Sequence, residues 1–195
     1  RAFTERLASY MPDFELYLQF DSFKPDVLKR LRGEDLTAVR RKAIDHLNEF
    51  NLSTTLVVTV EKGVNDDEIG AIIDYAMKQR CVRGVTFQPV QAAGRTEQYD
   101  PATDRITLTE VRQGILDQCP VFTPEDIVPV PCNPDALAMG YALKLNGEVF
   151  PLTRMIDPDD LLNNSRNTIV YEQDARLKEH MVKLFSTGTP SDKAH

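Results

Sequence analysis

The sequence lacks the cysteine patterns that mark disulfide-rich domains and zinc ribbons. It has three cysteines, Cys81, Cys119 and Cys132, and they lie far apart in the chain. An odd number at this spacing argues against a secreted disulfide framework, so a reducing, cytoplasmic environment is expected. No CxxC pair occurs, which excludes the usual zinc ribbon. Cys81 and Cys119 lie near the ends of expected helices and are interpreted as packed thiols.

Several other signals are also missing. No apolar run approaches the roughly 20 residues that a membrane-spanning helix needs. The first residues show no signal-peptide pattern and no initiator methionine, so the sequence is expected to be an excised piece of a longer protein. There is no phosphate-binding P-loop, no GxGxxG fingerprint, no HExxH and no GxSxG motif.

Excess positive charge is missing as well. The 195 residues carry a formal net charge of -7, with 42% hydrophobic and 27% charged residues. This composition is typical of one soluble domain, or of one domain with a tail. An acidic chain repels phosphate backbones, so we expect no nucleic-acid partner.

The first half of the chain alternates strand and helix signals. Residues 14–20 alternate apolar and other side chains, and residues 52–60 are dense in β-branched residues. Residues 85–88 predict a third short strand, which Pro89 stops. Between them, residues 36–50 and residues 69–77 have helical periodicity. Strands that alternate with helices predict right-handed crossovers and a parallel sheet, belonging either to a barrel or to an open sheet.

Within residues 36–50, the periodicity predicts one apolar face, with Arg40 largely on the opposite face. Asn51 is expected to stop this helix, and Asn65 or Asp66 to cap the next one. The apolar positions of the first helix are Leu36, Val39, Ala43, Leu47 and Phe50.

The second half is less regular. Residues 108–119 predict a helix, and residues 120–134, with five prolines, predict an extended and ordered loop. Asn146-Gly147 between two apolar runs, 138–145 and 148–154, is typical of a β-hairpin. The remaining expectations are a polar, turn-rich stretch over 91–107, helices over 157–162 and 172–185, and a frayed tail over 186–195.

Polar residues follow the expected parallel strands. Function collects at the carboxyl ends of such strands, so these side chains are candidates for one ligand site. The alternative is that Asp21 and Glu61 only begin turns, and that Arg95 is a solvated loop residue rather than an anion ligand. The candidate residues are Gln19, Asp21, Thr59, Glu61 and Gln88.

Three segments in the first half resemble radical S-adenosylmethionine (SAM) enzymes in order and spacing. The match covers roughly residues 14 to 95. Residues 17–23 and 31–36 resemble that superfamily's fourth barrel strand and the segment after it, residues 58–70 resemble its fifth strand and turn, and residues 83–90 with Gly94-Arg95 resemble its sixth strand and exit loop.

The second half is similar to one branch of the superfamily, which includes tetraether lipid synthase-like and molybdenum-cofactor-protein-like radical SAM proteins. The residues that carry this similarity are 128–134, 140–143 and 150–154. That branch often has a further cysteine shortly after the position of Cys132, where this chain has Asp135-Ala136-Leu137. The resemblance makes Cys132 a candidate ligand of an auxiliary cluster, and the alternative is a buried thiol.

The resemblance implies a parallel-strand partial TIM-type barrel in an α/β fold, followed by a carboxyl-terminal hairpin and helices. Residues 1–107 would form the half barrel, 108–185 the extension and 186–195 a flexible tail. The superfamily's CxxxCxxC motif lies before the fourth strand and is absent here. The chain would thus be the carboxyl-terminal part of an iron–sulfur enzyme whose SAM and [4Fe-4S] cluster belong to the parent, with no cluster held by this chain alone.

By family position, Gln19 and Asp21 would face the SAM ribose or carboxylate, Thr59 and Glu61 would contact SAM or substrate, and Gln88 with Pro89 would approach adenine. The expected substrate of the parent is a small molecule, a lipid or a peptide. A stand-alone, non-catalytic α/β module that binds a small molecule is the alternative. A third hypothesis is a small enzyme with Asp21 or Glu61 as general base.

A half barrel has a physical consequence. Its first strand, near residues 14–20, would present unpaired backbone groups, and apolar residues that face the missing strands would be exposed. We therefore expect the chain to associate with itself through this open edge.

Overall fold

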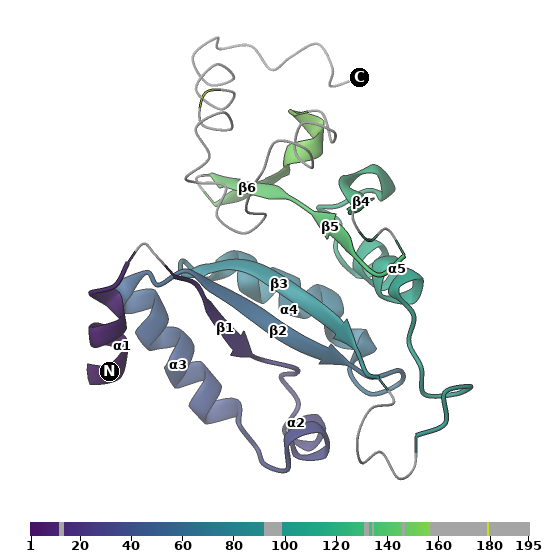
Figure 1. Ribbon diagram of the computed structural model, residues 1–195, viewed down its shortest axis with the longest axis horizontal. Helices are drawn as coiled ribbons and strands as arrows, with labels where there is room; N and C mark the ends of the chain where they lie inside the picture. Colours follow the sequence, from purple (N-terminus) through teal and green to yellow (C-terminus); the bar gives the residue numbers. More distant parts are fainter. Residues whose placement is uncertain are drawn as a thin grey trace. The chain divides into compact units, whose positions relative to one another are not determined.

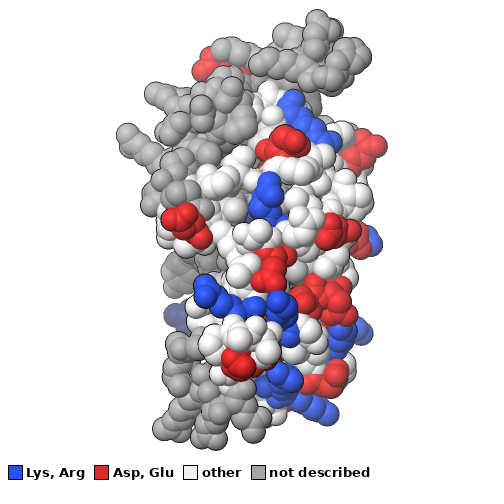
Figure 2. Space-filling view, turned by 90° about the vertical axis from the view of Figure 1, so that its right-hand side faces the viewer, with Lys and Arg blue, Asp and Glu red and all other residues white. Residues whose placement is uncertain are grey.

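A computed structural model describes residues 1–11, 14–91, 99–130, 133, 135–145, 147–156 and 179. The chain divides into two compact units, Arg1–Cys119 and Pro120–His195, each of which is described by itself. Basic and acidic side chains are interspersed on the described part of the face in Figure 2.

The first unit is built on a three-stranded parallel sheet. Its strands are β1 (Leu16–Gln19), β2 (Thr54–Val60) and β3 (Val82–Pro89), in the order β1-β2-β3. Their arrows lie side by side and point the same way in Figure 1. The parallel sheet predicted from the alternation of strands and helices is therefore confirmed. No closed barrel is present within the described ranges, so a partial barrel stays a prediction.

Helices connect and flank these strands. The α3 helix ends as predicted at Asn51, whose φ of 50° is the left-handed conformation common after helices. The sequence patterns did not predict α1 and α2. The α2 helix has Pro25 in its first turn and ends at Gly33. The helices are α1 (Ala2–Ala8), α2 (Pro25–Arg32), α3 (Thr37–Phe50), the 3-10 turn η1 (Asp66–Glu68), α4 (Ile69–Lys78) and α5 (Leu108–Gln118).

The predicted apolar face of α3 is wrong at two positions. Val39 is 65% exposed, whereas Arg40 is buried together with Ile44 and Leu47. Arg40 is stable in the interior because its guanidinium pairs with the carboxylate of Asp21. A buried ion pair of this kind reverses the usual rule that arginine marks the solvent face of a helix.

The two faces of the sheet differ in polarity. Leu56, Val58 and Val60 alternate along β2 and are fully buried, so they form the apolar core beneath the helices. The side chain of Thr59 points to the other face, as does that of Gln88, its in-register partner on β3. This face is the one that carries polar side chains at the ends of the strands.

The described residues of the second unit form two antiparallel strand pairs. β4 (Ile127–Pro129) pairs with β5 (Ala138–Gly140), and β6 (Ala142–Leu145) pairs with β7 (Glu148–Pro151). The hairpin predicted around Gly147 is confirmed, although residues 138–140 pair with a strand inside the proline-rich segment instead. A small core of Tyr141, Leu152 and Ile156 supports these pairs.

The carboxylate of Asp126 fixes the entry to β4. It accepts hydrogen bonds from the backbone amide and hydroxyl of Thr123, at 2.7 and 2.8 Å, and from Arg154 at 3.0 Å. Thr123 and Asp126 form a capping box around the short 3-10 turn η2 (Pro124–Asp126), and a second such turn, η3 (Leu152–Arg154), follows β7.

Several predicted features fall outside the described residues. These are the loop arginine at position 95, the cysteine at position 132, the helix over 157–162 and the tail over 186–195; of the helix over 172–185, only residue 179 is described. Within the described ranges, no helix has both the length and the apolar character needed to cross a membrane.

The contact between α4 and α5 predicts the outcome of one substitution. A β-carbon at Gly70 would lie 2.6 Å from the β-carbon of Gln118, and the Gly70 amide donates to the Gln118 side chain at 3.0 Å. We expect Gly70→Ala to lower the free energy of unfolding by about 1–3 kcal/mol, although alanine has the higher helix propensity by about 1 kcal/mol. Urea denaturation measures the change. The exposed control Ala71→Ser should change it by less than about 0.5 kcal/mol, and a stabilised Gly70→Ala would contradict the packing.

Candidate functional site

The carboxylate of Asp21 organises the carboxyl ends of β1 and β2. Asp21 directly follows the end of β1, is completely buried, and accepts five hydrogen bonds. Arg32 donates from Nε and Nη2, at 2.8 and 2.9 Å, and Arg40 donates at 2.8 Å. Gln19 Nε2 donates at 2.7 Å and the backbone amide of Thr59 at 3.0 Å. Both carboxylate oxygens are thereby fully used by the protein.

The backbone at Asp21 adopts an uncommon conformation. Its φ is 61°, in the left-handed region that residues other than glycine enter at a cost of about 1–3 kcal/mol. Aspartate tolerates this region better than most residues, and the five hydrogen bonds offset the cost. The turn after β1 therefore depends on the side chain that stands there.

The protonation of Asp21 follows from its partners. Burial by itself raises the pKa of the carboxyl, but the hydrogen bonds from Arg32, the Thr59 amide and Gln19 outweigh it and lower the pKa to about 2. Asp21 is therefore ionised at neutral pH. A general base works best with a pKa near the working pH, so this carboxylate is unsuited to that role.

The two arginines have different environments. Arg40 is buried, which lowers the pKa of its guanidinium, and the nearby Asp21 partly offsets this. It also donates to the backbone carbonyl of Phe20. Arg32 comes from the end of α2, its side chain is 32% exposed, and its hydrogen bond to Asp21 raises the pKa of the guanidinium. One arginine therefore lies in the core and the other reaches the surface.

Asn65 ties the same strand ends together from the opposite side. Its side-chain amide donates to the carbonyls of Asp21 and Thr59, at 2.9 and 2.8 Å, and its carbonyl accepts from the amide of Glu61 at 2.9 Å. Asn65 stands at the N-cap position of η1, as predicted, but its side chain makes no capping bond there. The alternative, Asp66, lies within η1 and accepts from the amide of Gly63 at 3.0 Å. Buried Glu68 accepts from the Ser22 hydroxyl and, at 3.1 Å, from the Phe23 amide.

Three of the predicted site residues form a row across the sheet. Gln19 Nε2 donates to Thr59 Oγ1 at 3.3 Å, and Thr59 stands in register with Gln88. Gln19 and Thr59 are partly buried and Gln88 is exposed. The row therefore offers amide and hydroxyl groups at the carboxyl edge of a parallel sheet, where ligands of α/β proteins bind.

Glu61, the remaining predicted site residue, forms an ion pair with α2 and does not join the polar row. Its carboxylate pairs with Arg30 on α2, and its side chain is 14% exposed while that of Arg30 is 62% exposed. An ion pair of this kind contributes up to about 1 kcal/mol. Glu61 thus helps to hold α2 against the turn after β2.

The described cysteines do not converge. Cys81 and Cys119 are both buried and unbridged, as the sequence analysis expected of packed thiols. The cysteine at position 132 lies outside the described residues. No group of three potential metal ligands occurs in the described part of the chain.

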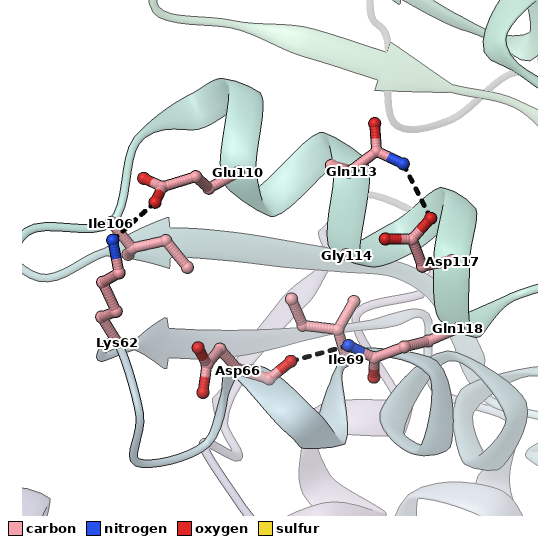
Figure 3. Close-up of a pocket in the computed structure, with 9 residues that line it drawn as sticks. All are labelled: Lys62, Asp66, Ile69, Ile106, Glu110, Gln113, Gly114, Asp117 and Gln118. Atoms are coloured by element: carbon pink, nitrogen blue, oxygen red, sulfur yellow. Dashed lines mark hydrogen bonds and ion pairs between the residues drawn. The ribbon is translucent and has the colours of Figure 1, made fainter.

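A second polar feature lies between η1, α4 and α5. It is an open pocket of about 270 Å³ whose walls include Lys62, Asp66, Glu110 and Gln118, as Figure 3 shows. Lys62 pairs with Glu110 at 2.7 Å, which lowers the pKa of Glu110 to about 2. Gln118 donates to the carbonyl of Asp66 at 2.8 Å. The polar groups of this pocket mainly bind one another.

Sequence reasoning missed Arg32 and Arg40 as members of the site. Arg32 belongs to the arginine–glycine pair of residues 32–33. Its position, 11 residues after an aspartate at a strand end, was the sequence feature that could have identified it. Arg40 gave a misleading signal, because a charged residue in an amphipathic helix is normally solvated.

No protein-family model matches the chain. The chain is 29% identical, over 195 residues, to a protein of Methanocaldococcus jannaschii named 7,8-dihydro-6-hydroxymethylpterin dimethyltransferase. The similarity covers 87% of this chain and 38% of that relative, so the chain spans well under half of the relative's length.

The buried carboxylate predicts the effect of Asp21→Asn. Removing one partner of a buried ion pair leaves uncompensated charge, so we expect the free energy of unfolding to fall by about 3–5 kcal/mol. Urea denaturation followed by circular dichroism measures this loss. The matched control is Asp74→Asn, which removes an exposed carboxylate paired with Lys78 and should cost less than about 0.5 kcal/mol.

The lowered pKa of Asp21 predicts that the stability difference between the wild type and Asp21→Asn depends on pH. The folded-state pKa of Asp21, about 2, lies below the unfolded value of about 3.9. The stabilisation is therefore complete above about pH 5 and is lost progressively as the pH falls through the folded-state pKa of Asp21, which amounts to about 2.5 kcal/mol. The stability difference between the wild type and Asp21→Asn should shrink over this range. A constant difference from pH 7 to pH 2 would contradict the lowered pKa.

Proposed function

We propose that this chain is the carboxyl-terminal part of a radical SAM methyltransferase that acts on a small molecule. The polar row of Gln19, Thr59 and Gln88, at the carboxyl edge of a parallel sheet, is the observation that carries the proposal. Two further lines support it: the resemblance of residues 14–95 to barrel strands four to six, and the similarity to a protein named as a dimethyltransferase.

The residues of the row fit SAM as a ligand. Thr59 has a hydroxyl, and the side-chain carbonyl of Gln19 accepts no hydrogen bond among the described residues, so the row presents both a donor and an acceptor. Gln88 offers an exposed amide at the end of β3. When bound, SAM supplies an activated methyl group and the radical chemistry of the superfamily. The residues of this chain bind and orient it, and Asp21 holds the row in place.

The described residues do not fit a [4Fe-4S] cluster. Such a cluster requires several thiolates, whereas the described part of the chain contains two cysteines, both buried, and no group of three metal ligands. Cluster ligands would therefore come from elsewhere in the parent protein or from the cysteine at position 132.

For the substrate, we propose a pterin or a related nitrogen heterocycle. The relative's name specifies a 7,8-dihydro-6-hydroxymethylpterin. The edge of a pterin alternates hydrogen-bond donors and acceptors, so its binding requires polar groups of the parent protein beyond the row that we assign to SAM. The alternative function, a stand-alone binding module, would use the same row to bind a small molecule without methyl transfer.

The proposal predicts the activity of variants of the complete polypeptide. With its cluster reconstituted under anoxic, reducing conditions, that polypeptide should cleave SAM and methylate a dihydropterin. Thr59→Val should raise the KM for SAM about 10-fold, the equivalent of one lost hydrogen bond of about 1.4 kcal/mol. The control Gln113→Ala, on the exposed side of α5, should leave it unchanged.

Activity assays with labelled SAM distinguish the proposed methyltransferase from a radical SAM enzyme with another substrate and from a binding module. Cleavage of SAM without methylation of a dihydropterin would leave the superfamily in place and overturn the substrate. Binding of SAM with no cleavage would favour the binding module, and failure both to bind and to cleave SAM would overturn the proposal.

We also propose that the chain associates with itself. β1 is the last strand on its side of the described sheet, so its outer backbone groups lack a strand partner there. Tyr17, on the same strand, is 56% exposed. Static light scattering of this chain should give a mass above that of one copy, increasing with concentration. A strictly monomeric species at all concentrations would exclude association through this edge.

A further inference from the structure

Arg32 stands between the buried carboxylate and the polar row. Its Nε and Nη2 atoms donate to Asp21, and Nη2 also donates to Thr59 Oγ1 at 2.8 Å. The remaining nitrogen, Nη1, donates to no acceptor among the described residues. Because the side chain is 32% exposed, two N–H groups of a fixed guanidinium are available to a ligand.

Thr59 offers a second donor at the same place. A threonine hydroxyl has two acceptor positions and one hydrogen to donate. Gln19 Nε2 and Arg32 Nη2 occupy the acceptor positions, at 3.3 and 2.8 Å. The hydroxyl hydrogen is left to donate, so the complementary ligand atom is an acceptor.

The charges around Arg32 do not cancel. One carboxylate, that of Asp21, faces two guanidiniums, so the group formed by Asp21, Arg32 and Arg40 retains one positive charge. Arg40 is buried, so this charge is accessible through Arg32. Glu61, on the turn after β2, is already paired with Arg30. A positive site therefore stands out on a chain whose net charge is -7.

We propose that Arg32 Nη1 and Thr59 Oγ1 form an anion subsite that binds a carboxylate or phosphate oxygen. Guanidinium groups bind such oxygens through paired, charge-assisted hydrogen bonds. The hydrogen bonds to Asp21 hold the guanidinium in one orientation, so little side-chain entropy is lost on binding. The subsite deepens the proposed function and rests on it for the source of the anion: a carboxylate of the cofactor, or an acidic group of the substrate.

Titrations of the 195-residue chain test this subsite with two probes. The first is inorganic phosphate. The second is S-adenosylhomocysteine, which carries a carboxylate, compared with 5′-methylthioadenosine, which has none. Calorimetry gives the dissociation constants, and the Nε–H resonances of arginine report which guanidinium responds. The wild type should bind at least one probe through Arg32.

Two variants remove the two donors separately. Arg32→Gln should weaken anion binding about 10- to 100-fold, as expected for a charge-assisted contact. Thr59→Val, which leaves the pair between Arg32 and Asp21 intact, should weaken it about 3- to 10-fold. The matched control is Lys29→Gln, which removes one positive charge from an exposed position of the same helix and leaves the pair between Arg30 and Glu61 intact, and it should change binding less than about 2-fold.

The outcomes separate the sources of the anion. If Arg32-dependent binding is seen only with S-adenosylhomocysteine, the anion is a cofactor carboxylate; if it is seen only with phosphate, the anion belongs to the substrate. Binding that none of these substitutions changes, or no binding of either probe, overturns the subsite.

If Arg32→Gln fails to fold, the effect of Thr59→Val on anion binding tests the subsite by itself. The titrations need no cluster, so an anion-binding chain from a parent that does not cleave SAM would refute the proposed function and leave the subsite standing.

Discussion

The structure of the first unit depends on one desolvated negative charge. The carboxylate of Asp21 is completely buried, and its hydrogen bonds connect the end of β1 to α2, α3 and β2. A buried charge is costly unless it is paired and hydrogen-bonded, so these four segments must be in place together. The positions of Gln19 and Thr59, which face the proposed ligand, follow from the same hydrogen bonds.

This arrangement separates support from recognition. Asp21 and Asn65 bind protein atoms only and fix the strand ends, whereas Gln19, Thr59 and Gln88 present groups on the polar face of the sheet. A rigid supporting layer beneath a site keeps its ligand-facing atoms in position. It also explains why the aspartate at the end of β1 makes no exposed contact of its own.

Much of the fold was predictable because strong local patterns agreed with the tertiary structure. The β-branched run of β2, the proline that ends β3 and the hairpin around Gly147 were all found in this way. The buried position of Arg40 was not, because it depends on a partner 19 residues away that periodicity does not reveal. The α2 helix was missed because its eight residues include a proline and three basic side chains, which mask the two buried residues Val27 and Leu28. For the site, the expectation that ligands bind at the carboxyl ends of parallel strands identified Gln19, Thr59 and Gln88. It does not distinguish residues that face a ligand from residues that support the site, and Asp21 is one of the latter.

The residues that pair with Asp21 are also close to it along the chain. Arg32 and Arg40 lie 11 and 19 residues from the aspartate. Closing each of these loops therefore costs about 0.6–1 kcal/mol less chain entropy than pairing β1 with β2 across about 38 residues. The segment from β1 to the first turns of α3 therefore contains the anion and both of its cations. The Thr59 amide of β2 completes this set of hydrogen bonds, so the local ion pairs and the strand pairing support one another.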